Sequence, residues 1–320
     1  MESGSNFIPV VDIGPLRDGS AVHEVAMALH RASTGSGFIY VSNHGIPESL
    51  LQGARATALA FFRQDPSVRQ QVAISAQHRG WLKPGAARMD DGLMPDLKES
   101  FVWGYEDDDG RAPDDHSLRG ANRWPTEMPA LREAAMGFFA GAEEVARHLL
   151  RAFAVGLGLQ PGFFLATSAS PMSRASFTYY PPQPTGGAGG QFGVGPHTDF
   201  GVLTVLWQDD VGGLEVEDLQ GRWIPAPPIP GTLVINVGDL LARWTNNVYR
   251  STPHRVINRS GQERLSLVLA FDPDPATVID ARQVFPGLTA APDPITCGDY
   301  LEWRFAKSFS YRKTGDVARA

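Results

Sequence analysis

The chain has 320 residues and a formal net charge of −7, with 42% hydrophobic and 20% charged residues. This balance is typical of a globular protein, and the length allows one large domain or two small ones. An acidic chain has no overall electrostatic attraction for nucleic acid or anionic lipid, so we expect neither as a partner. The single cysteine, Cys297, excludes an intramolecular disulfide and a metal site built from several thiolates. A metal here must be bound by histidine and carboxylate.

The N-terminal residues lack a basic run followed by a long apolar stretch, which predicts a cytoplasmic protein rather than a secreted one. No apolar segment reaches about 18 residues, the length expected of a membrane-spanning helix, so we expect no membrane association. For its assembly we expect a monomer or a weak homo-oligomer.

The first part of the chain, residues 1–125, predicts a mixture of strands and helices. Two short β-branched strands and two helices are expected in the order 7–12, 20–34, 37–42 and 47–64. Residues 75–120 are polar and rich in Gly, Pro and Asp. The acidic run at 106–109 is typical of a solvated loop.

The second part, residues 126–320, begins with a long helix at 128–156 whose apolar side chains recur at helical spacing. Short alternating strands then follow closely, separated by Gly, Pro and Asn turns: 174–180, 201–208, 213–218, 221–226, 232–237, 255–259 and 264–271. No helix of about 10–15 residues separates them, which favours an antiparallel sandwich or barrel. A last helix is expected at 298–311. Since no linker divides the two parts, we expect one globular unit.

Two histidines and an aspartate among these strands could bind one metal. His197 and Asp199 are two positions apart in an extended segment, so both can face the same side, and His254 arrives from a later strand. Two imidazoles and one carboxylate leave positions of an octahedral ion open, which suits non-haem Fe(II). A His-x-Asp pair is common by chance, and either histidine alone is more simply a core residue. The constellation of three favours a metal.

Arg264 is the candidate for binding an anion. It begins the strand 264–271, where alternation places Arg264 and Ser266 on one face and the leucines on the other. If both faces are buried, the guanidinium needs an anion, and no carboxylate in the strands except Asp199 is an obvious partner. A dicarboxylate co-substrate fits, because arginine offers a planar fork and Ser266 a further donor. The hydroxyl of Tyr180 could join them.

Several longer stretches occur in fixed order over nearly the whole chain. They are IPVVDI, GFIYVSNHGIP, DLKESF, YYPPQP, HTDFGVLTVLWQDDVGGLEV, PGTLVINVGDLL, NVYRSTPHRVIN, ERLSLVLAF and GDYLEWRFAKSF. Together they resemble the isopenicillin N synthase-like family of Fe(II)- and 2-oxoglutarate-dependent dioxygenases. The resemblance implies a mainly β fold with flanking helices, in which a double-stranded β-helix (jelly roll) core follows a mostly helical N-terminal region.

The resemblance also implies roles for individual residues. The iron ligands, and so the catalytic centre, would be His197, Asp199 and His254. Arg264 and Ser266 would bind the distal carboxylate of 2-oxoglutarate, assisted by the hydroxyl of Tyr180. Plant members of the family often have asparagine where this chain has Thr178. The implied reaction consumes O2 and 2-oxoglutarate and releases succinate and CO2, and the substrate is hydroxylated, desaturated or cyclised.

Two alternatives stay open on the sequence alone. One is an oxidase like isopenicillin N synthase, which uses the same iron site without 2-oxoglutarate. The other is a non-catalytic small-molecule-binding protein on the same fold. In either case a small amino-acid-like or secondary-metabolite ligand is more plausible than a macromolecule. Aromatic residues that could line its pocket, each equally credible as core, are Phe200, Trp207, Trp244 and Phe271.

Overall fold

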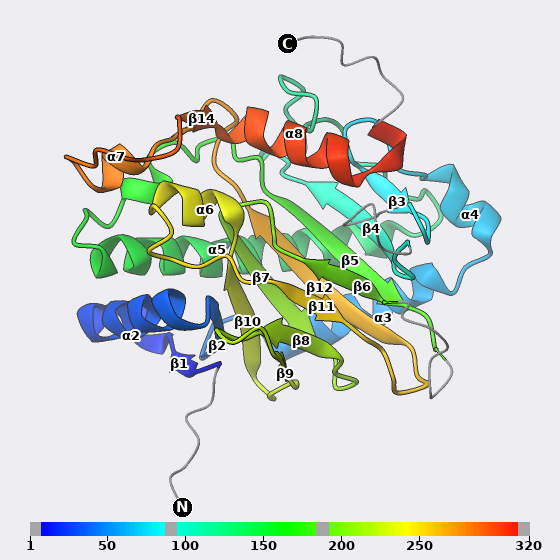
Figure 1. Cartoon of the computed structure of the whole chain (residues 1–320). Helices are drawn as coiled ribbons and strands as arrows, with labels where there is room; N and C mark the ends of the chain where they lie inside the picture. Colours follow the sequence, from blue (N-terminus) through cyan, green and yellow to red (C-terminus); the bar gives the residue numbers. More distant parts are fainter. Residues whose placement is uncertain (1–7, 87–94, 184–191, 313–320) are drawn as a thin grey trace, which may run out of the picture.

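A computed structural model describes residues 8–86, 95–183 and 192–312 of the protein. An eight-stranded sheet and a four-stranded sheet pack their inner faces together through one apolar cluster, and helices cover the outer face of the larger sheet (Figure 1). The fold is therefore mainly β with flanking helices around a jelly-roll core, which confirms the predicted fold class.

The helices in chain order are α1 (Gly14–Asp18), α2 (Val22–Gly35), α3 (Glu48–Phe62), α4 (Pro66–Gln71), α5 (Pro129–Gly156), α6 (Asp239–Trp244), α7 (Ala281–Val284) and α8 (Cys297–Ser308). Short 3-10 turns, η1 and η2, span Phe163–Leu165 and Ser310–Arg312. Within the described residues, no helix is long and apolar enough to cross a membrane.

The strands form two main sheets. The larger has the order β1-β2-β10-β7-β12-β5-β4-β3, and the smaller has the order β6-β11-β8-β9. Their bounds are β1 (Val10–Asp12), β2 (Phe38–Ser42), β3 (Gly80–Leu82), β4 (Glu99–Gly104), β5 (Arg174–Tyr180), β6 (Val194–His197), β7 (Leu203–Gln208), β8 (Leu214–Glu217), β9 (Trp223–Pro225), β10 (Thr232–Val237), β11 (His254–Val256) and β12 (Arg264–Phe271). A separate pair, β13 (Val278–Ile279) and β14 (Ile295–Thr296), lies near α8. Strands from both parts of the chain thus share one sheet.

The helix α5 supports the centre of the large sheet. Its apolar side chains recur on one face, and that face packs against β7 and β12 while α2 and α3 pack on its flanks. The outward side chains of β12, which are Leu265, Leu267, Leu269 and Phe271, are fully buried under this layer. The other face of β12 points into the barrel and is buried at Arg264 and Ser266, so the condition under which Arg264 needs an anion is met at this end of the strand.

Residues 75–120 are not all loop, because they contain β3 and the fully buried strand β4. The charge of Glu99 in β4 is neutralised by Arg69 of α4, and the Trp81 indole N–H donates to the same carboxylate at 2.6 Å. The prediction of a solvated acidic run holds for Asp108 and Asp109, which are exposed, but not for Glu106, whose buried carboxylate pairs with Arg132 at 2.6 Å. Arg69 and Trp81 lie 30 and 18 residues before Glu99 in the sequence, so the local pattern does not show that the charge of Glu99 is neutralised.

The end of α8 closes over a buried imidazole, His78. The ring centroid of His78 lies 4.7 Å from those of both Phe305 and Phe309, and Nδ1 contacts the hydroxyl of Tyr311. Burial lowers the pKa of His78 well below its ordinary value, and positive charges, with Arg174 first among them, lower it further. The imidazole is therefore neutral in the folded protein at neutral pH.

Replacing His78 by glutamine is expected to reduce the amount by which the free energy of unfolding falls in mild acid. The unfolded imidazole takes a proton below about pH 6.5 but the folded one does not, so protonation favours the unfolded state as the pH falls. The free energy of unfolding of the wild type should drop between about pH 7.5 and pH 5.5, and that of His78→Gln should drop less. Urea unfolding at both pH values measures this, with the exposed His23→Gln as control. Equal drops in wild type and His78→Gln would contradict it.

Candidate active site

The two predicted metal-binding histidines lie side by side on neighbouring strands of the small sheet. His197 ends β6, His254 begins β11, and the two are direct cross-strand partners. Nδ1 of His197 lies 2.8 Å from the carbonyl oxygen of Gly195, and Nδ1 of His254 lies 3.2 Å from that of Thr252. A carbonyl oxygen only accepts, so each Nδ1 carries the proton and each Nε2 keeps its lone pair for a metal.

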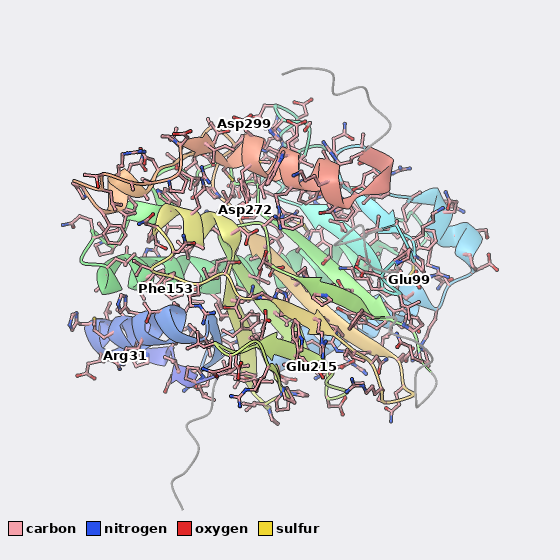
Figure 2. All side chains as sticks on the ribbon, viewed as in Figure 1. Arg31, Glu99, Phe153, Glu215, Asp272 and Asp299 are labelled. Carbon is pink, nitrogen blue, oxygen red and sulfur yellow. The ribbon has the colours of Figure 1, made fainter. Side chains whose placement is uncertain are left out.

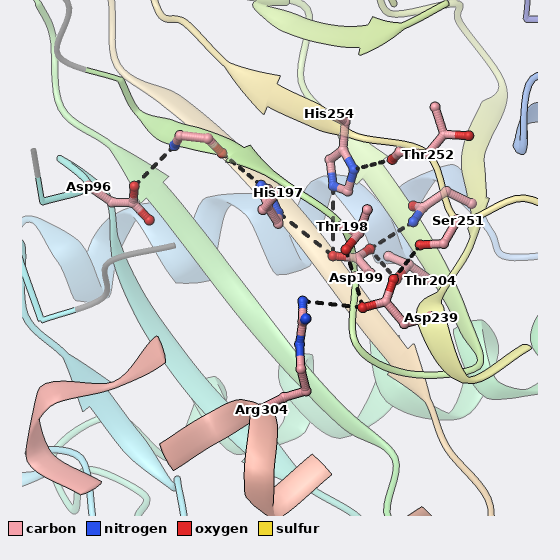
Figure 3. A network of polar contacts seen from close by, with 12 residues as sticks. Asp96, His197, Thr198, Asp199, Thr204, Asp239, Ser251, Thr252, His254 and Arg304 are labelled. Carbon is pink, nitrogen blue, oxygen red and sulfur yellow. Dashed lines mark hydrogen bonds and ion pairs between the residues drawn. The ribbon is translucent and has the colours of Figure 1, made fainter. Parts of the chain in front are cut away.

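Asp199 completes a group of three ligand atoms that lie within 4.8 Å of one another (Figure 3). Its Oδ1 is 3.7 Å from Nε2 of both His197 and His254. Its Oδ2 accepts hydrogen bonds from the Thr204 hydroxyl at 2.5 Å and from the Asn236 amide at 2.8 Å. The two oxygens are thereby divided, with one held by the protein and the other free to bind an ion.

The protonation states of His197 and Asp199 suit a cation. Burial lowers the pKa of His197, and the positive form of His254 beside it would lower it further. Burial alone would raise the pKa of Asp199, but the positive forms of the two imidazoles and the hydrogen bonds to its Oδ2 outweigh burial, so this pKa is lowered. At neutral pH His197 is neutral and Asp199 is ionised, and neutral imidazole with ionised carboxylate is the state that binds a metal. The donor set therefore fits Fe(II).

The loop that carries Asp199 is fixed by close backbone contact with the start of α6. The amide of Asp239 donates to the carbonyl of Asp199 at 2.7 Å, and the amide of Leu240 donates to that of Gly201 at 3.0 Å. A Cβ on Gly238 would lie 2.1 Å from the carbonyl oxygen of Gly201, so only glycine allows this approach. The position of Asp199 is thus set by the backbone around it.

The carboxylate of Asp239 connects this loop to α8 (Figure 3). It accepts from the hydroxyls of Thr198 at 3.2 Å and Ser251 at 2.7 Å, and these residues lie beside the ligand-bearing segments. From α8, the Tyr300 hydroxyl donates to it at 3.2 Å and the Arg304 guanidinium lies 3.2 Å away. One partly buried carboxylate therefore joins both ligand segments to the C-terminal helix.

Arg264 is only 1% exposed and lies in the barrel interior. It donates to the carbonyl of Gly212 and to Ser266 Oγ, both at 2.6 Å. Among the described residues it has no carboxylate within the 4.0 Å of an ion pair. The nearby Asp209 uses its oxygens for the amides of Leu265 and Val211. A buried guanidinium without a counter-ion is costly, so this site calls for an anion from outside the chain.

One cavity of about 130 Å³ connects Arg264 with the metal-binding group. Its lining residues are Phe38, Lys98, Ser176, Thr178, Tyr180, Val194, His197, Asp199, Thr204, Leu206, Leu214, Asn236, His254, Val256, Arg264, Ser266 and Val268. The structure thus brings the predicted metal ligands and the predicted anion-binding residues together around one small cavity.

Tyr180 and Thr178 also lie in this cavity. The Cζ of Arg264 lies over the aromatic ring of Tyr180, 4.6 Å from the centroid of that ring. Tyr180 therefore contacts the guanidinium through its ring and not through its hydroxyl. The hydroxyl of Thr178 lies 3.2 Å from that of Ser176 and 3.4 Å from that of Ser100.

The four aromatic residues suggested for a substrate pocket lie in different places. Phe200 follows Asp199 and packs 4.2 Å from the Arg304 guanidinium, outside the cavity lining. Trp207 faces outward beside Leu267, and Phe271 is on the same buried outer face. Trp244 packs on Phe164 with ring centroids 5.2 Å apart. Phe200 is thus the one of the four that is partly exposed and adjacent to a metal-binding residue, and the other three lie in the core.

Several residues of the site are not singled out by sequence patterns. Asn236, Thr204 and Asp239 act on Asp199 or its loop, and Lys98 lines the cavity. Each lies inside a stretch that resembles the dioxygenase family, namely PGTLVINVGDLL, HTDFGVLTVLWQDDVGGLEV or DLKESF. That resemblance was the one available signal, because isolated polar residues in strands carry no pattern of their own.

Two family models match the chain. The model of the 2OG-Fe(II) oxygenase superfamily matches residues 171–273, and that of the non-haem dioxygenase in morphine synthesis N-terminal region matches residues 8–127. The first match contains His197, Asp199, His254 and Arg264. The second covers the helices and strands that precede α5.

Known proteins resemble the chain over most of its length. The 2-oxoglutarate-Fe(II) type oxidoreductase ppzC of Metarhizium majus is 34% identical over 81% of this chain and 76% of its own. Homoarginine-6-hydroxylase 2-ODD-C23 of Glycine max is 33% identical over 88% and 89%. The crystal structure of a full-length Neurospora crassa protein in complex with alpha-KG and thymine superposes with a TM-score of 0.83, at 29% identity over 96% and 98%. The chain belongs to the 2OG-Fe(II) oxygenase superfamily, and it is an Fe(II)- and 2-oxoglutarate-dependent dioxygenase that oxidises a small molecule.

Proposed function

We propose that His197, Asp199 and His254 hold the iron, and that Arg264 and Ser266 bind the distal carboxylate of 2-oxoglutarate. The observation that carries this proposal is the buried guanidinium of Arg264, which has no ion pair among the described residues and shares a cavity with the three metal-binding side chains. Its fork and the Ser266 hydroxyl together offer the donors that a carboxylate accepts. The Tyr180 ring stabilises the cation from below.

The remaining side chains keep the site ordered. Thr204 and Asn236 hold one oxygen of Asp199, and the backbone carbonyls beside His197 and His254 fix the orientation of both rings. Part of the cavity wall is apolar: Phe38, Val194, Leu206, Leu214, Val256 and Val268. When bound, iron and 2-oxoglutarate would supply the chemistry that activates O2 and oxidises the substrate, with release of succinate and CO2.

We propose hydroxylation as the outcome, supported by the name of a relative, homoarginine-6-hydroxylase. Phe200 is the proposed aromatic wall for the substrate, because it directly follows the ligand Asp199 and packs on Arg304 of α8. We further propose a cytoplasmic protein that is a monomer or a weak homo-oligomer. A reducing compartment keeps iron ferrous, which supports the location.

The test begins with the anaerobic addition of Fe(II) and then 2-oxoglutarate to the metal-free protein. A visible absorption band should appear only when both are present, because the co-substrate must bind beside the ion. On admission of O2, succinate should form in an amount that follows 2-oxoglutarate loss. O2 consumption with Fe(II) and substrate but without 2-oxoglutarate would instead identify an oxidase, and tight binding of a metal without any O2 chemistry would identify a binding protein.

A further inference from the structure

Lys98 is a charged residue of the cavity, and none of the roles proposed above involves it. It lines the cavity together with His197 and Asp199. Within residues 8–86, 95–183 and 192–312, its ammonium group makes no ion pair within 4.0 Å and no side-chain hydrogen bond. Lys98 is partly buried, and burial removes water from an ammonium group, so a cavity-lining lysine without such a partner needs a reason.

The backbone of Lys98 is fixed against the segment that leads into β6, the strand of His197. The amide of Lys98 donates to the carbonyl of Gly193 at 3.3 Å, and Asp96 Oδ1 accepts from the amide of Gly195 at 3.0 Å (Figure 3). The position of the lysine relative to the metal-binding histidine is therefore set by hydrogen bonds on both sides of it.

The direction of the Lys98 side chain follows from the direction of its neighbour Glu99. Glu99, labelled in Figure 2, points to the opposite face of β4, where it meets Arg69 and Trp81. Alternation then turns Lys98 toward the barrel interior, on the side of Ser100, whose hydroxyl meets the cavity residue Thr178. Lys98 reaches the cavity because of strand geometry, so its charge is part of the built site.

The anions expected in the loaded site have partners other than Lys98. The iron and Arg264 bring three positive charges, and Asp199 and the two carboxylates of 2-oxoglutarate bring three negative ones. The carboxylate of Asp96 lies farther from the ammonium group than an ion-pair distance, and its Oδ1 accepts from the amide of Gly195. The ammonium group of Lys98 therefore has no anion in contact with it, and a second reactant is the group that could supply one.

The other charged groups that surround His78 together with Lys98 do not pair with the lysine. Arg174 is paired with Asp272, 2.8 Å away beneath α8 (Figure 2). Arg79 is buried and donates to the backbone carbonyls of Gln77 and His78.

We propose that Lys98 binds an anionic group of the substrate, so the substrate of this dioxygenase is a small carboxylic acid or phosphate ester. This inference rests on the proposed function, because the cavity is a reaction site only with iron and 2-oxoglutarate in place. The ammonium group would hold the anion beside the metal centre, and so would fix which carbon of the substrate faces it.

The experiment compares compound retention by loaded proteins in the absence of O2. Wild type and Lys98→Met, each with Fe(II) and 2-oxoglutarate, are incubated with an equimolar mixture of small carboxylic acids, their primary amides, phosphate monoesters and amines of matched carbon skeletons. Bound compounds, 2-oxoglutarate included, are separated by ultrafiltration and identified by mass spectrometry. The matched control is Lys307→Met, which removes a lysine on α8, outside the cavity lining.

The expected result is selective retention of acids by wild type and Lys307→Met, with affinities about 10- to 100-fold lower in Lys98→Met. Carboxylic acids or phosphate esters among the retained compounds would distinguish the two sources of the anion. The proposal is overturned if the retained set is the same in all three proteins, an empty set included, or if amides and amines are retained as well as acids. Weaker binding of 2-oxoglutarate to Lys98→Met would also overturn it, whereas its absence from wild type would refute the co-substrate site instead.

Discussion

Arg264→Met is expected to weaken 2-oxoglutarate binding by about thirtyfold or more while the protein still folds. Truncating one partner of a buried charge pair costs about 2–5 kcal/mol, and here the partner left unpaired is the distal carboxylate of the co-substrate. In the free protein no ion pair is lost, because Arg264 has none among the described residues. Anaerobic titration of the Fe(II)-loaded variant with 2-oxoglutarate, followed by the visible band, measures the dissociation constant.

Two further variants make that result specific. Arg31→Met removes an exposed arginine on α2, labelled in Figure 2, and should leave the dissociation constant unchanged. Arg264→Lys keeps the charge but loses the planar fork, so its affinity should fall between those of wild type and Arg264→Met. If all four proteins bound 2-oxoglutarate alike, Arg264 would have no part in co-substrate binding.

Asp199→Ala is expected to abolish turnover through loss of the metal. The substitution removes a ligand and leaves two imidazoles without a charge to offset the cation. Substituting a residue that hydrogen-bonds to a metal ligand typically lowers the metal affinity about 10- to 100-fold, and loss of the ligand itself should lower it more. Competitive titration with a chelator measures the affinity for Fe(II), and succinate formation measures turnover.

A graded series tests whether the effect is due to metal binding. Asn236→Ala removes the 2.8 Å hydrogen bond to Asp199 Oδ2 and should weaken Fe(II) binding less than Asp199→Ala does. Asp280→Ala removes the carboxylate that caps α7 and should leave metal affinity unchanged. An Asp199→Ala protein that bound Fe(II) as tightly as the Asp280→Ala protein would exclude Asp199 as a ligand.

The jelly-roll strands were predictable because their patterns are local. β5, β10 and β12 begin and end at the predicted residues, since each is an alternating or apolar run between turn residues. The need of Arg264 for an anion followed from the same alternation. That alternation also places Phe271 on the face opposite Arg264, which argues against a place for Phe271 in the cavity.

β4 and the groups that surround the metal ligands were not predictable, because what defines them is distant in sequence. Glu99 is compatible with a buried strand only because Arg69 and Trp81 come to meet it. Asn236 becomes significant only when β10 brings its amide to Asp199. Single polar residues of this kind gain their meaning from tertiary contacts, which no local period reveals.

The carboxylate of Asp239 makes the order of the metal centre and the docking of α8 one thermodynamic event. It is shared between Thr198 and Ser251 near the ligands and Tyr300 and Arg304 on the helix. Linkage is reciprocal, so an ion that orders the ligand segments also stabilises the docking of α8. A ligand that stabilises the docked helix raises the affinity for the ion by the same factor. The C-terminal helix is thus energetically part of the iron site without providing a ligand to it.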